Sequence, residues 1–154
     1  MSKLRWRHWP QYLLALLLLL LIVLMGWTYY LGKPAVTFER LVGSAPYAQI
    51  EDLSLRRYKK GAISPHLFTI RTHDAQAVTD RIVQDCGMQK VAPEALPKVL
   101  DEVDKEMVAV IGHSPFVYQS TKYDLSHPDK GRLCVLFADK RDLYLFINGN
   151  LEGQ

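Results

Sequence analysis

The hydrophobic residues of this chain are unevenly distributed, with one long uninterrupted block near the N-terminus. Residues 12–30 read YLLALLLLLLIVLMGWTYY and include no charged side chain. An α-helix rises about 1.5 Å per residue, so about 20 apolar residues cross a hydrocarbon layer of about 30 Å. A helix in the core of a soluble protein would carry a polar stripe, which this block lacks. The pattern predicts a transmembrane helix over residues 12–31.

Aromatic side chains lie at both ends of the block, as expected where a helix passes through two headgroup layers. A cleaved signal peptide is the alternative, but its apolar region is usually about 7–15 residues long and ends in small residues. Here the block ends in bulky residues, and Ala45 and Ala48 lie well downstream. We therefore expect a retained anchor. The bracketing aromatic residues are Trp6, Trp9, Tyr12, Trp27, Tyr29 and Tyr30.

The charges that flank the block predict its orientation. Lys3, Arg5 and Arg7 precede it with no acidic residue among them, and positive flanks stay in the cytoplasm. The opposite flank also carries basic residues, so the asymmetry is modest. We expect residues 1–11 to be a cytoplasmic tail. The chain contains no N-x-[ST] sequon, which favours a bacterial inner membrane with the domain in the periplasm.

Residues 32–48 are expected to tether the anchor to the domain. Pro34 would end the membrane helix, and Val36, Phe38 and Leu41 would form a short strand or the first turn of the domain. Residues 43–46 have the composition of a loop.

Residues 49–150 are expected to fold as one extracytoplasmic domain, with a short tail at 151–154. Alternation of apolar and polar residues predicts strands, and clusters of polar residues and glycine between them predict turns. The first two strands would form an antiparallel hairpin, and so would the last two. The predicted strands are 50–58, 66–72, 117–124, 132–138 and 143–148, with turns at 59–61, 126–131 and 139–142.

Two amphipathic helices are predicted between the second and third strands. Asp74 can cap the first helix, Val78, Ile82 and Cys86 line its apolar face, and Gly87 ends it. The predicted order is two strands, two helices and three strands, which is typical of an α+β domain. We expect a mainly antiparallel sheet of about five strands with two helices on one face. The second helix would cover 93–107, with Val99, Leu100, Val103 and Met107 apolar and a solvated acidic face.

The composition excludes several classes of function. The formal net charge is +3, and the basic residues are scattered among nearly as many acidic ones, unlike the basic stripe of a nucleic-acid-binding domain. The chain contains no P-loop, no G-x-G-x-x-G, no EF-hand loop and no C-x-x-C. We therefore expect no nucleic-acid partner and no cofactor.

Catalytic and metal-binding patterns are weak. Residues 112–114 read Gly-His-Ser after an apolar run, but a nucleophile elbow needs a second glycine where Phe116 stands. No histidine pair has the spacing of a metal site, although zinc ligands can come from distant segments. We expect no catalytic residue, no metal site and no enzymatic activity. The histidines beyond the anchor are His66, His73, His113 and His127.

Cys86 and Cys134 are the two cysteines of the chain. One lies near the end of a predicted helix and the other within a predicted strand. In an oxidising compartment they could form a disulfide, which would stabilise the fold by about 4 kcal/mol in the chain-entropy model. Two buried thiols are the equally supported alternative.

Arg56, Arg57, Lys59 and Lys60 form the one dense basic cluster, interrupted by Tyr58. Charge on an edge strand discourages pairing between sheets, and we favour this role. Contact with lipid headgroups or with a partner is the alternative, because the cluster lies near the membrane end of the domain.

A small anchored domain without catalytic motifs is typical of a binding protein. We expect a membrane-anchored, non-enzymatic periplasmic binding or assembly protein of the bacterial cell envelope, with an immunity or inhibitor protein as a special case. Its expected partners are lipid, through the anchor, and a protein in the periplasm or membrane. An accessory subunit of an inner-membrane complex is the alternative, and a small hydrolase or metal enzyme is less favoured.

Overall fold

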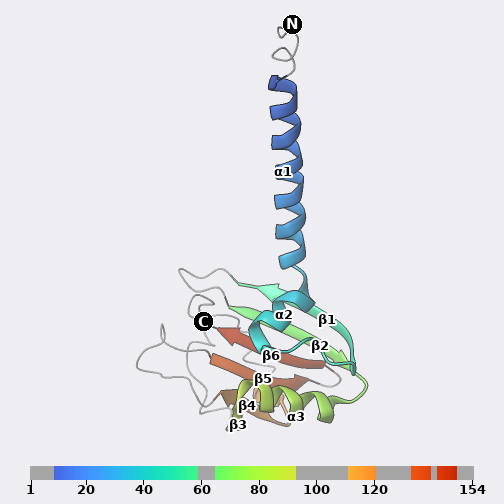
Figure 1. The fold of residues 1–154 in the computed structure, drawn as a ribbon. Coiled ribbons are helices and arrows are strands. Elements are labelled where there is room, and N and C mark those ends of the chain that lie inside the picture. Colours follow the sequence, from blue (N-terminus) through green and yellow to red (C-terminus); the bar gives the residue numbers. More distant parts are fainter. Residues whose placement is uncertain (1–8, 59–64, 93–110, 121–132, 140–141, 149–154) are drawn as a thin grey trace, which may run out of the picture.

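The fold comes from a computed structural model (Figure 1), which describes residues 9–58, 65–92, 111–120, 133–139 and 142–148. Several predicted elements lie outside these residues and stay predictions. They are the second amphipathic helix at 93–107, the turns at 59–61 and 126–131, and the end of the strand predicted at 117–124.

Helix α1 (Trp9–Leu31) projects from the rest of the molecule as a single rod (Figure 1). It has 23 residues, and none of them is buried. Even mid-helix leucines such as Leu18 and Leu21 are 54% exposed. By length and composition α1 can cross a membrane. Water is a poor solvent for such an apolar surface, and the domain does not cover it, which is compatible with a membrane-spanning helix.

Helix α2 (Pro34–Val42) occupies the segment that the sequence suggested was a tether, and the expectation of a short strand or turn there is wrong. Pro34 lies in the first turn, where a missing N–H leaves no hydrogen bond unmade. Phe38, Leu41 and Val42 follow helical spacing and are all buried. Gly43 ends the helix with a φ of 88°, which a glycine adopts without strain.

Six strands form one sheet in the order β1-β2-β6-β5-β4-β3, and each neighbouring pair is antiparallel. The α+β class and the five predicted strands are confirmed, and β3 is an additional strand too short to predict from alternation. The strands are β1 (Ile50–Arg57), β2 (His66–Thr72), β3 (Met88–Lys90), β4 (Val117–Ser120), β5 (Leu133–Asp139) and β6 (Asp142–Asn148).

Helix α3 (Ala75–Cys86) carries the chain from β2 to β3 at the far edge of the sheet. Its predicted start and end are confirmed. The Asp74 carboxylate accepts a hydrogen bond from the backbone N–H of Ala77 at 3.0 Å, and Gly87 ends the helix with a φ of 58°. Val78 and Ile82 are buried, as the four-residue spacing predicts.

The sheet carries a buried apolar cluster on each face. On one face, α2 and α3 pack against β2, β5 and β6 through residues such as Phe38, Ile82 and Leu136. The second cluster contains the oppositely directed residues of the same strands, including Val135 and Phe146, with Ile111 packed beside them. Burial on both faces explains why β5 reads as a nearly continuous apolar run.

Candidate functional site

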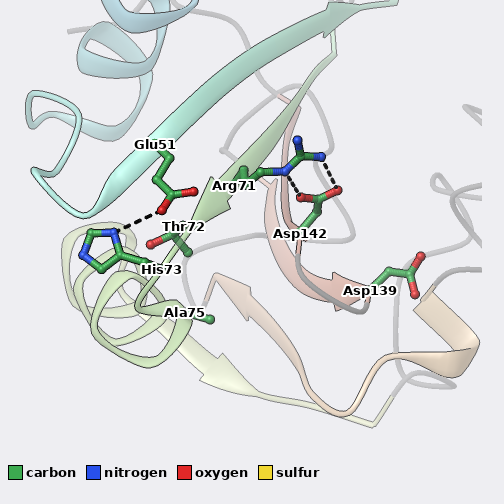
Figure 2. A pocket seen from close by; sticks show the side chains of 7 residues that line it. All are labelled: Glu51, Arg71, Thr72, His73, Ala75, Asp139 and Asp142. Atoms are coloured by element: carbon green, nitrogen blue, oxygen red, sulfur yellow. Dashed lines mark hydrogen bonds and ion pairs between the residues drawn. The ribbon is translucent and has the colours of Figure 1, made fainter.

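An open pocket lies where the first residues of β1, the last of β2, the start of α3 and the β5–β6 turn come together (Figure 2). Its volume is about 800 Å³, and most of its lining residues carry charge. They come from segments that are far apart in the sequence and meet only through the strand order. The lining residues are Glu51, Arg71, Thr72, His73, Ala75, Asp139 and Asp142.

Arg71 and Asp142 form the best-defined ion pair of the pocket. They are register partners on β2 and β6, so sheet pairing itself places them side by side. Arg71 Nε donates to Asp142 Oδ1 at 3.1 Å, and its Nη2 donates to Oδ2 at 3.4 Å. The hydrogen bonds and the negative charge of Asp142 raise the pKa of the Arg71 guanidinium. The two hydrogen bonds hold the pair in one relative orientation.

Glu51 and His73 face each other across a second wall of the pocket (Figure 2). The distance from His73 Nδ1 to Glu51 Oε1 is 3.5 Å, and the two side chains are 61% and 55% exposed. An exposed pair of this kind contributes little to stability, because solvent screens the charges. Both groups are accessible to a molecule that enters the pocket.

Thr72 orders the backbone between β2 and α3. Its hydroxyl donates to the carbonyl of Gln49 at 2.6 Å and accepts from the N–H of Asp74 at 3.1 Å. Asp74 in turn caps α3. Consecutive local bonds thus position this wall of the pocket before any ligand arrives.

Asp139 completes the pocket at the end of β5, opposite Asp142 in the hairpin. In the part of the chain that the structure describes, no cation pairs with its carboxylate. Burial, followed by the negative charges of Asp142 and Asp139, raises the pKa of the nearby Tyr144 phenol. Among the described lining residues, three carboxylates stand beside one guanidinium and one imidazole, a set that suits a cationic group. Lys140 and Arg141, which separate Asp139 from Asp142 in the sequence, lie outside the described residues.

Metal binding has no support among the described residues. These residues hold no group of three or more His, Cys, Asp or Glu side chains placed to bind a metal ion. Within the pocket, Arg71 already engages Asp142 through both carboxylate oxygens.

The predicted basic cluster lies at the other end of β1. Arg57 Nη2 donates to the carbonyl of Gly32 at 3.1 Å and to Thr37 Oγ1 at 3.3 Å. Arg56 lies over the ring of Tyr58, with 5.5 Å between the guanidinium carbon and the ring centroid. Lys59 and Lys60 lie outside the described residues. Arg57 lies six positions after Glu51, so about 20 Å along the strand separates this cluster from the pocket.

Cys86 and Cys134 contribute to the same apolar cluster between α3 and the sheet. Cys134 is buried and Cys86 is partly buried, and both are thiols in the structure. Their common location fits either interpretation of the sequence, so the disulfide stays a prediction.

Ser114 has a position that accounts for the Gly-His-Ser motif without catalysis. Its hydroxyl donates to the carbonyl of Phe116 and accepts from the N–H of Ala138 at 2.9 Å. The serine therefore joins the loop before β4 to the end of β5. His113 is exposed beside it.

Comparison with known proteins returned no match: no family model, no curated protein and no solved structure is significantly similar to this chain. None of the pocket residues was predicted as a site. A weak signal existed in the charges at strand ends, at Arg71, Asp139 and Asp142, but alternation alone does not say which strand ends meet.

Proposed function

We propose that this chain is a membrane-anchored, non-enzymatic binding or assembly protein. Its α1 helix holds it in a bacterial inner membrane, and its domain works in the periplasm. The observation that carries the proposal is the charged pocket at the end of β1 remote from α1. A pocket in that position is directed toward molecules in solution or on a neighbouring protein, while the other end of the strand meets the anchor.

The chemistry of the pocket favours a basic segment of a protein partner. Asp139 offers a carboxylate without a cation among the described residues, and Glu51 is well exposed. The Arg71–Asp142 pair is bidentate, so it can orient a partner by hydrogen bonds as well as by charge. A lysine or arginine of the partner would place its cation between Asp139 and Glu51. This attraction would mainly increase the association rate and the specificity of binding.

Site-specific cross-linking in intact cells tests the proposal. A photoreactive amino acid is placed at Ala75, an exposed position that lines the pocket, in the full-length chain. The matched control carries it at Gln89, an exposed position on the edge strand β3. We expect one discrete adduct from Ala75 and none from Gln89.

The charge dependence of this adduct is the decisive readout. Asp139→Lys should reduce its yield about tenfold or more, since a like charge replaces the attractive one. Asp80→Lys, at an exposed position on α3, should leave the yield unchanged. An adduct that is insensitive to Asp139→Lys would refute the pocket as the contact point.

The alternative of an accessory subunit is favoured by α1, whose apolar surface is exposed on all sides of the helix. That surface could pack against other membrane helices as well as against lipid. Replacing residues 12–31 with an unrelated membrane helix separates the two functions. Retention of the Ala75 adduct supports the binding role, and its loss supports the accessory subunit.

A further inference from the structure

The basic end of β1 lies at the level where α1 ends. Gly32, the residue after α1, offers its carbonyl to Arg57 at 3.1 Å. A guanidinium here also meets the negative end of the helix dipole, which is a favourable arrangement. Because this contact joins β1 to the end of α1, the end of β1 lies at the bilayer surface whenever α1 spans the bilayer.

Two further basic residues adjoin this contact in the sequence, and consecutive β1 residues such as Arg56 and Arg57 project to opposite faces of the sheet. Lys33 follows Gly32, and its Nζ lies 5.9 Å from the ring centroids of both Tyr29 and Tyr30. Arg56 precedes Arg57, is exposed, and stacks on Tyr58. We call Lys33, Arg56 and Arg57 the basic collar. Tyrosine side chains prefer the headgroup layer, so the rings of Tyr29 and Tyr30 place Lys33 at headgroup depth.

We propose that the basic collar binds anionic phospholipid headgroups in the leaflet that faces the domain. This inference rests on the proposed membrane anchoring and adds a second, lipid-specific contact to it. If these charges only protected a sheet edge from pairing with another sheet, two observations would be left unexplained. β1 is indeed an edge strand, but such protection does not require Arg57 to reach Gly32, nor Lys33 to lie outside the sheet.

The expected strength follows from the number of charges. Each basic residue near an anionic surface increases association roughly fivefold, so removal of two residues lowers it by up to about 25-fold. Screening shortens the range of this attraction to about 3 Å in 1 M salt. The lipid preference should therefore weaken strongly in high salt.

Electron spin resonance of spin-labelled lipids measures this preference on the full-length protein. The protein is reconstituted into phosphatidylcholine bilayers that contain spin-labelled phosphatidylglycerol or spin-labelled phosphatidylcholine. The fraction of motionally restricted label gives the relative association constant of each lipid. Every protein carries glutamine in place of Lys3, Arg5 and Arg7, so that only the flank on the domain side contributes.

The collar variant is Lys33→Gln with Arg56→Gln. Arg57 is left in place because of its contact with Gly32. Lys33 supports α2 through its backbone carbonyl, which accepts from Thr37, so glutamine preserves this support. The control is Lys90→Gln with Arg81→Gln, an equal change in charge on β3 and α3, which lie away from α1 (Figure 1).

We expect the protein with an unsubstituted collar and the control variant to associate severalfold more strongly with phosphatidylglycerol than with phosphatidylcholine. The collar variant should lose most of this selectivity. Equal selectivity in the collar variant and the control overturns the proposal. Absence of any motionally restricted lipid means instead that α1 is not in the bilayer, which is a failure of the anchoring. Thermal unfolding monitored by circular dichroism shows whether each variant is folded.

Discussion

Ser114 shows how a single hydroxyl can join two distant segments of a chain. It bonds to the carbonyl of Phe116 and to the N–H of Ala138, 24 residues along the sequence. The backbone group of Ala138 is buried, and such a group is costly to leave without a partner.

We predict that Ser114→Ala lowers the free energy of unfolding by about 1–3 kcal/mol, because it leaves the Ala138 N–H without its acceptor. Urea denaturation of the detergent-solubilised chain measures the change. Ser54→Ala, at an exposed position on β1, is the control and should change stability by less than about 0.5 kcal/mol. A neutral result for Ser114→Ala would show that the hydroxyl is not structural.

Tyr47 gives the domain a pH dependence on the alkaline side. Its hydroxyl donates to Asp85 at 2.8 Å, and Ser44 donates to the same carboxylate oxygen at 2.8 Å. Burial raises the pKa of the Tyr47 phenol, the nearby Asp85 raises it further, and the Ser44 hydrogen bond opposes them. The folded state therefore holds this proton at a pH at which the unfolded chain releases it.

We predict that this contribution to stability is complete below about pH 10 and is lost as the pH rises above it, since the unfolded tyrosine ionises first. Tyr47→Phe should flatten the loss of stability between neutral and strongly alkaline pH. A residual slope is expected from Tyr144, whose pKa is also raised by burial. Melting temperatures across this pH range check the prediction, with the pH 7 value isolating the loss of the hydrogen bond.

At the scale of elements, α2 makes the segment after the anchor part of the domain core. Phe38 is fully buried, and its ring meets those of Phe68 and Tyr47 edge to face at 5.4 Å and 5.9 Å. Such aromatic pairs add to the stabilisation gained from burial alone.

Phe38→Ala should therefore destabilise the fold by about 3–5 kcal/mol, through lost burial and the cavity left behind. The neighbouring Glu39 is exposed, and Glu39→Ala should have an effect below about 0.5 kcal/mol. Urea midpoints of the two variants give the comparison. A small effect of Phe38→Ala would mean that α2 is a tether after all.

Structural features that depend on interactions within a few residues could be predicted from the sequence. Features that depend on pairing between distant segments could not. Asp74 and Gly87 bound α3 as expected, because caps depend on local backbone groups. Pro34 was misleading, since proline both ends one helix and begins the next. β3 has three residues, too few for a pattern, and it exists because β4 pairs with it. Because β5 has apolar residues on both faces, its sequence pattern does not indicate which strands pair with it.

At the scale of the molecule, the strand order creates the candidate site. Arg71 meets Asp142 only because β2 pairs with β6. The two strands are far apart in the sequence, since 69 residues lie between Thr72, the last residue of β2, and Asp142, the first of β6. Glu51 joins them because β1 pairs with β2. Pairing over such separations depends on the packing of the whole core, so local alternation could not predict the pocket.

The orientation of the whole chain is testable with a reporter. A fluorescent protein that matures only in the cytoplasm should stay dark when fused after the last residue of the chain, and should be bright when fused before the first. This expectation follows from the basic residues that precede α1. Bright C-terminal fusions would reverse the orientation and place the pocket in the cytoplasm.

The joint between α1 and α2 limits how far the domain can move from the end of α1. Only Gly32 and Lys33 separate the two helices, a reach of about 7 Å. A flexible linker over residues 32–48 would have had a root-mean-square end-to-end distance of about 20–25 Å, and the domain could have moved that far from its attachment point. With α1 in a bilayer, as proposed above, the domain would instead move together with its anchor, and its encounters would be confined to a thin layer above the bilayer. A partner held in the same membrane is met by lateral diffusion, at a far higher local concentration than a freely diffusing one.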